Sequence, residues 1–305
     1  MRVLITGGAG FIGSHLAEHY RERAQVRVLD DFRTGHRRNL AGLDVELLEG
    51  SVCDPAAVRR AVQGVDVVYH LAALVSVPES VEKPAECARI NIEGLRHVLA
   101  AAADAGVGKL LLASSAAVYG DNPAVPKVEA MTPEPRSPYA DTKLGGEALL
   151  EEYQREHGLA TAALRFFNVF GPRQDPGSAY AAAVPIFLAQ ALRGEPLTIY
   201  GDGGQTRDFI YVKDVVGALA FLGHADGTAA SGVFNAGYGG QTTILELART
   251  IIRLAGSRSE IRYAPGRAGD VRHSRAAVDK LCATGWRPAF TLEQGLAATL
   301  EAFRL

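Results

Sequence analysis

The first 168 residues alternate short apolar runs with longer helical patterns, and no other feature limits the fold as strongly. The runs are apolar throughout, which is typical of strands buried on both faces of a sheet. Strands that alternate with helices form parallel sheets covered by helices on both sides. The sequence therefore predicts an α/β fold with a doubly wound parallel sheet over residues 1–168. The expected strands are Arg2–Thr6, Gln25–Asp30, Val45–Leu48, Val65–His70, Lys109–Ala113 and Ala160–Phe166, and the expected helices are Phe11–Arg23, Pro55–Val62, Ala85–Ala105 and Ser137–His157.

Residues 169–305 follow a different pattern, in which Gly- and Pro-rich loops separate the helical segments. The loops read GPRQDPG, GDGGQTRD and APGRAGD. They predict a smaller α/β lobe at the C-terminal side, which we expect to bind the substrate. We expect the chain to return to the large sheet around residues 208–240, near Phe209–Val212. Further helices are expected at Ala181–Arg193, Val212–Leu222, Ile244–Ala255 and Leu292–Phe303.

Composition excludes several classes of function. The 32 Lys and Arg against 34 Asp and Glu give a net charge of −2, so no basic excess attracts nucleic acid or an anionic membrane. The N-terminus lacks the pattern of a signal peptide, and no apolar run has the length of a membrane span. Cys53, Cys87 and Cys282 are odd in number and far apart, which indicates neither a disulfide framework nor a metal site. We expect a soluble cytoplasmic protein without a metal.

A glycine-rich loop follows the first predicted strand and opens the first predicted helix. Thr6–Ser14 reads TGGAGFIGS, with Gly7, Gly10 and Gly13 spaced three apart. Such glycines allow a tight turn, close approach of the backbone to a pyrophosphate, and close packing of helix on sheet. The helix N-terminus adds N–H groups and the positive end of its dipole. The loop predicts a dinucleotide site of the Rossmann type.

An acid at the end of the second predicted strand bears on which dinucleotide binds. Asp30 stands 20 residues after Gly10, where a carboxylate can accept hydrogen bonds from the adenosine ribose. A carboxylate would also repel a 2′-phosphate, so NAD is favoured over NADP. The nearby Arg33, Arg37 and Arg38 leave an NADP site as the alternative, and Asp30 with its neighbour Asp31 could instead be ordinary turn residues.

Tyr139 and Lys143 form a Tyr-x-x-x-Lys pair on one face of the predicted helix Ser137–His157. A free tyrosine has a pKa of about 10, which is too high for a general base at neutral pH. A lysine ammonium one turn away, together with a positive nicotinamide ring, favours the tyrosinate. Ser114 and Ser115 end the fifth predicted strand, at the edge where open α/β sheets hold ligands. The alternative is a solvated pair on the helix surface, but lysine is scarce in this chain.

Five further segments complete a pattern: SSAAVYG, SPYADTK, RFFNVFGPRQ, TRDFIYVKD and GDVRHS. With them the chain resembles the extended short-chain dehydrogenases/reductases, and among these the nucleotide-sugar 4-epimerases. The similarity extends over almost the whole length. It implies a tightly bound NAD, a UDP-sugar substrate and a homodimer. In such a dimer the helices Ala85–Ala105 and Ser137–His157 would form a four-helix bundle with their copies.

The resemblance implies epimerisation at C4 of a UDP-hexose through a 4-keto intermediate. Tyr139 would remove the proton of the 4-hydroxyl while hydride passes from C4 to NAD. The keto sugar would then rotate and take back the hydride and the proton on its opposite face. Ser115 would bind the 4-oxygen, and Lys143 would hold the nicotinamide ribose and support the tyrosinate.

The resemblance also implies which other residues touch the two ligands, although each has an ordinary structural explanation when taken alone. Arginines near the diphosphate would bind it in bidentate fashion. The expected cofactor contacts are Gly7, Gly10, Phe11, Ile12, Gly13, Asp30, Asp31, Ser51, Val52, Leu71, Ala72, Ala73, Ser114, Tyr139 and Lys143. The expected substrate contacts are Asn168 at the diphosphate or sugar, Arg207 and Arg267 at the diphosphate, Asp270 at the uridine ribose, Leu197 and Tyr200 at the uracil, and Ser274 at the sugar.

Two positions depart from the pattern of the relatives. Ser51–Val52 stands where many have an Asp–Ile or Asp–Val pair that binds adenine, and the nearby Asp54 is also the expected N-cap of its helix. Ala116–Ala117 stands where related 4,6-dehydratases carry Asp–Glu and related UDP-glucuronate decarboxylases carry Ser–Glu. The missing acids favour epimerisation over dehydration or decarboxylation.

Ser274 is a small residue where relatives that accept only plain hexoses carry a tyrosine. It leaves room for a 2-acetamido group, so we expect UDP-glucose, UDP-galactose and their N-acetylated counterparts to bind. Three alternatives remain: a UDP-glucuronate 4-epimerase, an NADP-dependent nucleotide-sugar reductase, and a non-catalytic redox-sensing protein of the same fold. Asp30 argues against the second, and the presence of Tyr139 and Lys143 argues against the third.

Overall fold

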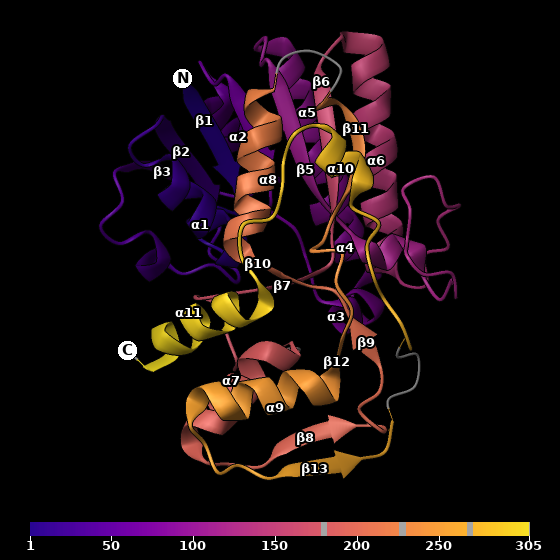
Figure 1. Cartoon of the computed structure of the whole chain (residues 1–305). Coiled ribbons are helices and arrows are strands. Elements are labelled where there is room, and N and C mark those ends of the chain that lie inside the picture. Colours follow the sequence, from indigo (N-terminus) through magenta and orange to yellow (C-terminus); the bar gives the residue numbers. More distant parts are fainter. Residues whose placement is uncertain (178–181, 226–229, 267–270, 305) are drawn as a thin grey trace.

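The computed structural model describes residues 1–177, 182–225, 230–266 and 271–304. A large sheet with helices on both faces lies above a smaller lobe of short strands and helices (Figure 1). The strands of the large sheet run from the side of the N-terminus toward the lobe, so their carboxyl ends face it. This arrangement places the ends of the predicted motif strands between the two parts of the molecule.

The expected doubly wound parallel sheet is confirmed. Among the described residues, seven parallel strands form it in the order β11-β6-β5-β4-β1-β2-β3. The six strands predicted in the first 168 residues are all present, with ends that shift by at most two residues. The strands are β1 (Arg2–Thr6), β2 (Gln25–Asp30), β3 (Val45–Glu49), β4 (Val67–His70), β5 (Lys109–Ser115), β6 (Ala160–Phe166) and β11 (Gly232–Ala236).

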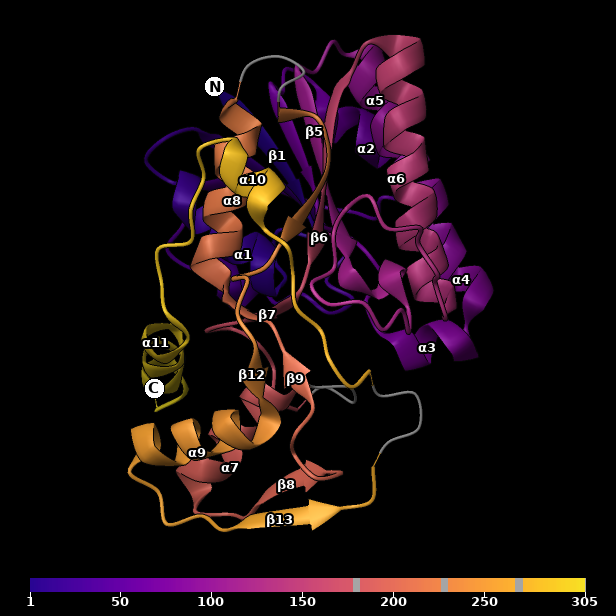
Figure 2. The same ribbon diagram turned by 45° about the vertical axis from the view of Figure 1, so that its right-hand side comes forward.

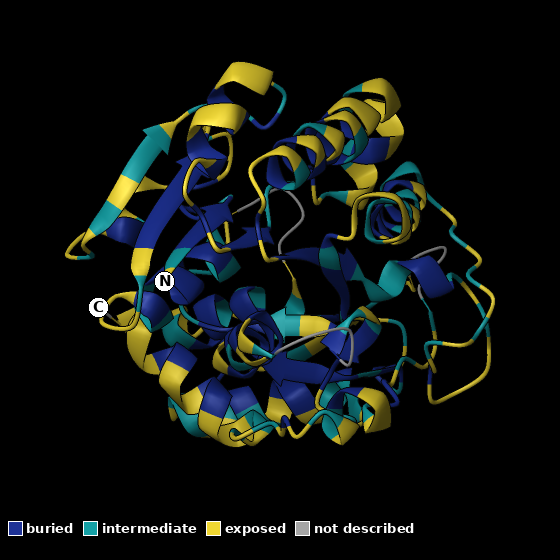
Figure 3. Ribbon diagram, turned by 90° about the horizontal axis from the view of Figure 1, so that it is seen from above, coloured by how far each residue is buried: buried dark blue, intermediate teal, exposed yellow. Residues whose placement is uncertain are grey.

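Two layers of helices cover the sheet. On one face pack α1 (Phe11–Tyr20) and α8 (Val212–His224), which share one hydrophobic core with the strands. On the other face a second core includes α2 (Pro55–Val62), α5 (Gly94–Asp104) and α6 (Pro138–His157). Seen from above, buried residues gather on the strands and exposed residues on the outer sides of the helices (Figure 3).

The predicted helix Ala85–Ala105 is wrong in one respect, because it is not a single regular helix. It divides into α4 (Pro84–Ala88), a π-helical turn η2 (Arg89–Glu93) and α5, with a further short helix α3 (Val77–Glu82) before it. In the π turn the Asn91 side-chain amide accepts the Leu74 N–H and donates to the Leu74 carbonyl. A π turn of this kind often marks a functional site.

The return of the chain to the large sheet is made by β11, which lies within residues 208–240. Phe209–Val212, where we expected it, does not supply the strand. Instead β10 (Phe209–Tyr211) pairs with β7 (Asn168–Phe170) in a separate two-stranded sheet.

The smaller lobe has its own hydrophobic core and two further pairs of strands (Figure 2). Its short strands pair in parallel as β8 with β13 and antiparallel as β9 with β12. The elements of this part are β8 (Leu197–Tyr200), β9 (Thr206–Arg207), β12 (Thr242–Thr243), β13 (Ile261–Ala264), α7 (Ala183–Arg193), α9 (Ile244–Ala255) and α11 (Leu292–Arg304), with α10 (Asp279–Ala283) beside β11.

In the described part of the chain, no helix has the length and apolar character needed to cross a membrane. Over the same ranges, no cluster of His, Cys, Asp and Glu side chains has the form of a metal site. The three cysteines are free thiols.

Candidate active site

The glycine loop connects the end of β1 to the start of α1. A side chain at Gly13 would place its Cβ 2.3 Å from the carbonyl oxygen of Gly7, and one at Gly7 would lie 2.8 Å from the backbone nitrogen of Ala72. Gly7 also has a φ of 70°, which favours glycine. The loop is therefore as tight as the sequence predicted, and only hydrogen atoms fit at these positions.

The N-terminus of α1 presents backbone donors at this loop. Gly10 is the N-cap and supplies no side chain to cap the helix, and the first intrahelical bond runs from the Ser14 N–H to the Gly10 carbonyl. The N–H groups of Phe11, Ile12 and Gly13 precede that bond and have no acceptor in the helix. Such donors, with the helix dipole, fit the pyrophosphate of a dinucleotide.

Asp30 ends β2 and is 7% exposed. Its two carboxylate oxygens accept the N–H of Ala9 in the glycine loop and the N–H of Phe32, both at 2.8 Å. Burial raises the pKa of Asp30, and the two N–H bonds oppose this rise. Asp30 thus holds the glycine loop, and its expected contact with a ribose stays a prediction. Asp31 is exposed and accepts the Arg33 N–H.

Two of the three arginines that left an NADP site as an alternative are paired with carboxylates. Arg33 binds Glu79 and Glu86, and Arg37 binds Glu49 and stacks on the Phe32 ring. A 2′-phosphate would have to compete with these carboxylates and with Asp30. The structure therefore favours a 2′-hydroxyl at this position.

The remaining expected cofactor contacts lie at the ends of β3 and β4. Leu71, Ala72 and Ala73 follow β4 and are half-buried beside the glycine loop. The Val52 side chain is buried against Gly94 of α5. Asp54 caps α2 by accepting the Ala56 N–H at 2.9 Å, which accounts for that acid. Contacts of Ser51 and Val52 with a cofactor stay predictions.

The catalytic pair lies at the start of α6, whose N-cap is Ser137. The Lys143 ammonium is 5.6 Å from the centre of the Tyr139 ring and donates a hydrogen bond to the Ala113 carbonyl at 2.8 Å. The Ser115 hydroxyl at the end of β5 lies close enough to Tyr139 to lower the pKa of the phenol. The Ser115 hydroxyl oxygen also accepts the Ala117 N–H at 3.2 Å. The three residues expected to carry out catalysis are thus brought together.

Burial dominates the acid–base properties of this pair. In the protein alone, burial raises the pKa of Tyr139, and the nearby Ser115 hydroxyl opposes the rise. Burial also lowers the pKa of Lys143 from 10.5 to about 8. Without a cofactor, loss of solvent therefore outweighs the neighbouring groups, and the expected joint effect of Lys143 and a positive nicotinamide ring on the Tyr139 pKa stays a prediction.

Several residues that support Tyr139 were not found from the sequence. The Tyr139 N–H donates to the Ser80 hydroxyl of α3 at 3.1 Å. Asn91 in the π turn donates to the Thr142 hydroxyl at 2.9 Å, and Thr142 donates to the Tyr139 carbonyl at 2.8 Å. Buried Cys87 adjoins Thr142. Asn91 lies in the π turn η2 and reaches Thr142 of α6 from there. The sequence pattern did not predict this turn.

A buried ion pair continues the same face of α6. Glu147 follows Lys143 by one turn and binds Arg165 of β6 through both carboxylate oxygens, at 2.7 and 2.9 Å. The two side chains are 6% and 4% exposed. The Ser114 hydroxyl also donates to Glu147 at 2.5 Å. The spacing of Tyr139, Lys143 and Glu147 at i, i+4 and i+8 was the signal in the sequence that would have found this residue.

The expected substrate residues lie in the smaller lobe and in the strands that lead to it. Asn168 is exposed in β7, Tyr200 is 39% exposed at the end of β8, and Leu197 is buried in the core of the lobe. Arg207 in β9 donates to the Thr206 carbonyl, and the Ser274 N–H donates to the same oxygen at 3.1 Å. The QTRD and VRHS segments therefore lie side by side. Arg267 and Asp270 lie outside the described residues, and their roles stay predictions.

The segment after Ser115 carries no acid that faces the catalytic pair. It is a 3₁₀ turn η3 (Ala116–Tyr119), in which Ala116 and Ala117 are half-buried. Dehydration and decarboxylation in the related enzymes depend on acids at these positions, as the family pattern implies. Two methyl groups cannot supply a proton.

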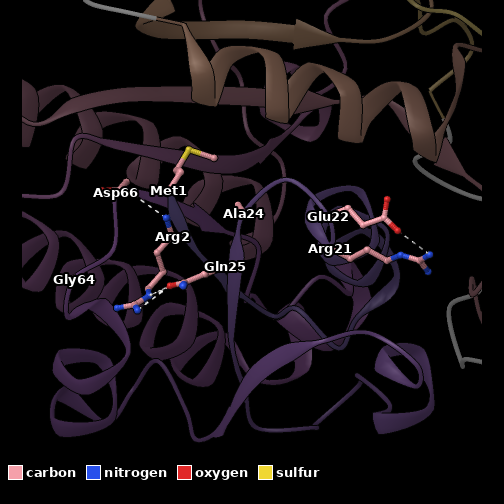
Figure 4. A pocket seen from close by; sticks show the side chains of 8 residues that line it. All are labelled: Met1, Arg2, Arg21, Glu22, Ala24, Gln25, Gly64 and Asp66. Carbon is pink, nitrogen blue, oxygen red and sulfur yellow. Dashed lines mark hydrogen bonds and ion pairs between the residues drawn. The ribbon is translucent and has the colours of Figure 1, made fainter.

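Neither of two hollows in the surface is lined by Tyr139, Lys143 or Ser115, although Glu147 and Arg165 line the second. One of about 610 Å³ is formed at the amino ends of the strands by residues such as Arg2, Gln25 and Asp66 (Figure 4). The Arg2 side chain there is bonded to Gln25 and its backbone N–H to Asp66. Another of about 1000 Å³ runs beside α6 and the edge of the sheet. Ligands of open α/β sheets bind at the carboxyl ends of strands, so the motif residues mark the site better than these hollows do.

Comparison with known proteins gives a consistent picture. The model of the NAD dependent epimerase/dehydratase family matches residues 3–237. A UDP-glucose 4-epimerase of Mycolicibacterium smegmatis is 38% identical, over 100% of this chain and 99% of that protein. UDP-glucuronic acid decarboxylase 1 of Danio rerio is 36% identical, over 99% of this chain and 72% of that protein. The structure of a UDP-N-acetylglucosamine 4-epimerase from Methanobrevibacter ruminantium M1, in complex with UDP-N-acetylmuramic acid, is 36% identical with a TM-score of 0.95, covering 99% of this chain and 98% of that one.

Proposed function

This chain belongs to the NAD dependent epimerase/dehydratase family, and from that premise we propose that it interconverts UDP-hexoses that differ in configuration at C4. Its cofactor is NAD, and it acts on nucleotide sugars as its relatives do. The observation that carries the finer assignment is the combination of the Tyr139, Lys143 and Ser115 triad with a following turn that has no acid.

Tyr139, Ser115 and Lys143 each have a separate role in the proposed reaction. NAD, when bound at the glycine loop, supplies the acceptor and donor of hydride. Tyr139 Oη takes the proton of the sugar 4-hydroxyl and returns it to the other face. Ser115 Oγ already accepts the Ala117 N–H, so its own proton is free to bond the 4-oxygen. Lys143 keeps a positive charge beside the ring at neutral pH, since its pKa is about 8, and this charge favours the tyrosinate.

The decisive experiment is incubation of the purified protein with UDP-glucose, UDP-N-acetylglucosamine and UDP-glucuronate in turn, without added NAD. Chromatography should show the galacto-configured products of UDP-glucose and UDP-N-acetylglucosamine, and turnover without added cofactor indicates tightly held NAD. Formation of a UDP-pentose from UDP-glucuronate, or of a 4-keto-6-deoxy sugar, would show that the absence of acids at Ala116 and Ala117 does not decide the reaction. Epimerisation of UDP-glucuronate alone would establish the alternative.

The breadth of the sugar pocket is a separate part of the proposal. Ser274 is half-buried and small, and its backbone is fixed to β9. A relative of 36% identity binds a UDP-linked N-acetylated sugar. Both observations support the acceptance of N-acetylated UDP-hexoses. Turnover of UDP-glucose without any turnover of UDP-N-acetylglucosamine would contradict this.

We also propose a homodimer formed by α4, α5 and α6 with their copies. Ala88, Ala100 and Ala148 on these helices are exposed, and such small side chains permit close packing of helices. Light scattering coupled to gel filtration should give twice the mass of 32.4 kDa. A monomer at micromolar concentration would contradict it.

A further inference from the structure

Arg33 forms a bridge between two segments that are far apart in the sequence. Its guanidinium donates to Glu79 of α3 at 2.8 Å and to Glu86 of α4 at 2.6 Å. Arg33 lies just after β2, whereas α3 and α4 follow β4. Two charge-assisted hydrogen bonds to separate helices fix one side chain more firmly than a single surface pair does.

The order of the strands shows what this bridge crosses. In the sheet, β1 lies between β2 and β4. A connection from the end of β2 to the helices after β4 therefore passes over the end of β1, where the glycine loop begins. A dinucleotide that extends from Asp30 toward Lys143 has to pass the same point. We propose that Arg33, Glu79 and Glu86 form an ionic clasp that closes over bound NAD and slows its release.

The segment that carries Arg33 is built onto the glycine loop on both sides of the arginine. Before it, Asp30 holds Ala9 and Phe32 through its carboxylate. After it, the Ala9 carbonyl accepts the His36 N–H at 3.0 Å and the Asn39 side-chain amide at 2.9 Å. The segment that carries Arg33 is therefore fixed by hydrogen bonds to the glycine loop, over which the clasp would close.

Backbone strain between these anchors directs Arg33. Phe32 has a φ of 57°, in the left-handed region that bulky residues rarely adopt. A conformation of this kind persists only where its surroundings impose it, and it often occurs at ligand clamps. Arg33 follows Phe32 directly, and its side chain reaches Glu79 of α3 and Glu86 of α4. The Asp31 carboxylate accepts the Arg33 N–H at 3.1 Å.

The opposite side of the clasp belongs to the helix that supports catalysis. Glu79 lies in the first turn of α3, capped by the Ser76 hydroxyl, and its neighbour Ser80 accepts the Tyr139 N–H. Lys83 and Arg89 lie 3.4 and 4.0 Å from Glu79 and Glu86, respectively, and balance their charge. Closure of the clasp thus links the adenosine end of the site to the support of Tyr139.

The clasp is also weak enough to open. The Arg33, Glu79 and Glu86 side chains are 31%, 26% and 31% exposed, so water and salt screen their attraction. A fully buried ion pair in this place would prevent exchange of the cofactor. Partial exposure gives a closure that retains NAD through many turnovers and still permits loading. This inference depends on NAD binding and not on which reaction follows.

The test measures the rate at which NAD leaves the loaded protein, by dilution into an excess of isotopically labelled NAD. Arg33→Gln should release NAD about tenfold faster, because each lost charge-assisted bond weakens closure. Glu79→Gln with Glu86→Gln should give a similar acceleration, and combining all three changes should add nothing more. Salt should speed release from the parent protein and have less effect on the variants.

Arg193→Gln is the matched control. It also breaks two hydrogen bonds between an arginine and a glutamate, here Glu195, but this exposed pair lies at the end of α7 in the smaller lobe. Release of NAD from this variant should equal that from the parent protein.

Three results would overturn the proposal. If Arg33→Gln speeds release but the double glutamine variant slows it, Arg33 binds the pyrophosphate directly and the carboxylates only restrain it. If both sets of changes leave the rate unaltered, no clasp exists. Failure of the protein to retain NAD also rejects it. None of these readings depends on turnover, so a failure of the proposed epimerisation remains distinguishable.

Discussion

The large sheet and the smaller lobe form their parts of the site in different ways. At the sheet, the cofactor region is built from backbone, namely a glycine loop, the N-terminus of α1 and the ends of paired strands. In the lobe, the expected contacts are side chains such as Tyr200, Arg207 and Ser274, on strands of two to four residues or on loops. A backbone site tolerates few changes in sequence, whereas side chains on short strands can change and alter specificity. We therefore expect the residues of the sheet to carry out the chemistry and those of the lobe to select the substrate.

Removal of the tyrosine hydroxyl should have the largest effect. Tyr139→Phe deletes the group that moves the proton and leaves the ring in place. We expect the turnover rate to fall by about 10³-fold or more, since a general base contributes roughly this much. The NAD content of the purified protein should stay the same, because the glycine loop is untouched. Initial rates with UDP-glucose and the absorbance of bound cofactor check both statements. Full activity in this variant would remove Tyr139 from the mechanism.

Loss of the buried ion pair should weaken the sheet region most. Glu147→Ala leaves Arg165 charged and unpaired at 4% exposure and removes the acceptor of Ser114. The free energy of unfolding should fall by about 3–5 kcal/mol. Urea unfolding measures it. Glu151→Ala, one turn later on the same helix and exposed, is the control and should change stability by less than about 0.5 kcal/mol. Equal effects of the two changes would show that the buried pair has no special role.

The fold of the sheet region could be predicted almost completely, and that of the lobe only in part. The local run of apolar residues is enough to predict a buried strand such as the one that contains Val3–Ile5. The predicted N-cap Asp54 is confirmed. Asn91 could not be assigned, because its contact with Thr142 needs a π turn that no local pattern specifies. The role of Phe209–Val212 was wrong because its partner β7 is itself only three residues long.

The site followed the same division. The close packing of Gly13 on Gly7 and the proximity of Tyr139 to Lys143 could be predicted, because a tight turn and helical spacing determine these neighbours. Leu197 lies in the core of the lobe with α7 and α9, and its expected contact with the uracil stays a prediction. An apolar residue in a two-stranded sheet can face either way, and only the packed lobe decides which.

Lys143 gives a prediction about pH. Its pKa falls from 10.5 in the unfolded chain to about 8 in the fold, so the folded protein binds fewer protons between these values. The buried charge destabilises the fold fully below pH 8. This penalty disappears as the pH rises toward 10.5, and it amounts to about 3 kcal/mol at 1.36 kcal/mol per pKa unit. Relative to Lys143→Met, the parent protein should therefore gain stability between pH 8 and 10 in urea unfolding. A constant difference across that range contradicts the burial argument.

A change in the lobe should alter selectivity and not chemistry. Ser274→Tyr fills the space proposed for a 2-acetamido group, which should lower kcat/KM for UDP-N-acetylglucosamine by about 10- to 100-fold, as steric discrimination commonly does. The value for UDP-glucose should change little, because Ser274 lies outside the catalytic triad. Ser274→Ala is the control, since it keeps the space. Equal losses with both sugars would mean that the tyrosine disturbs β9 and that the pocket argument does not hold.

The smallest effects test whether the two regions unfold as one unit. Asp54 caps α2 beneath the large sheet, and Thr243 forms a capping box with Glu246 at the start of α9 in the lobe. Replacement of either by Ala should lower the free energy of unfolding by about 1 kcal/mol.

Trp286, the single tryptophan, is 6% exposed in the core beside α8, so its fluorescence reports on the large region, whereas circular dichroism reports on both. Phe11 and Ile12 of the cofactor loop pack against the core of the lobe, and this shared packing should make unfolding cooperative. Both variants should then shift both signals equally. A shift of the dichroism signal alone in Thr243→Ala would show that the lobe opens by itself, and the side chains that choose the substrate would then rest on a less stable part of the molecule than those that carry out the chemistry.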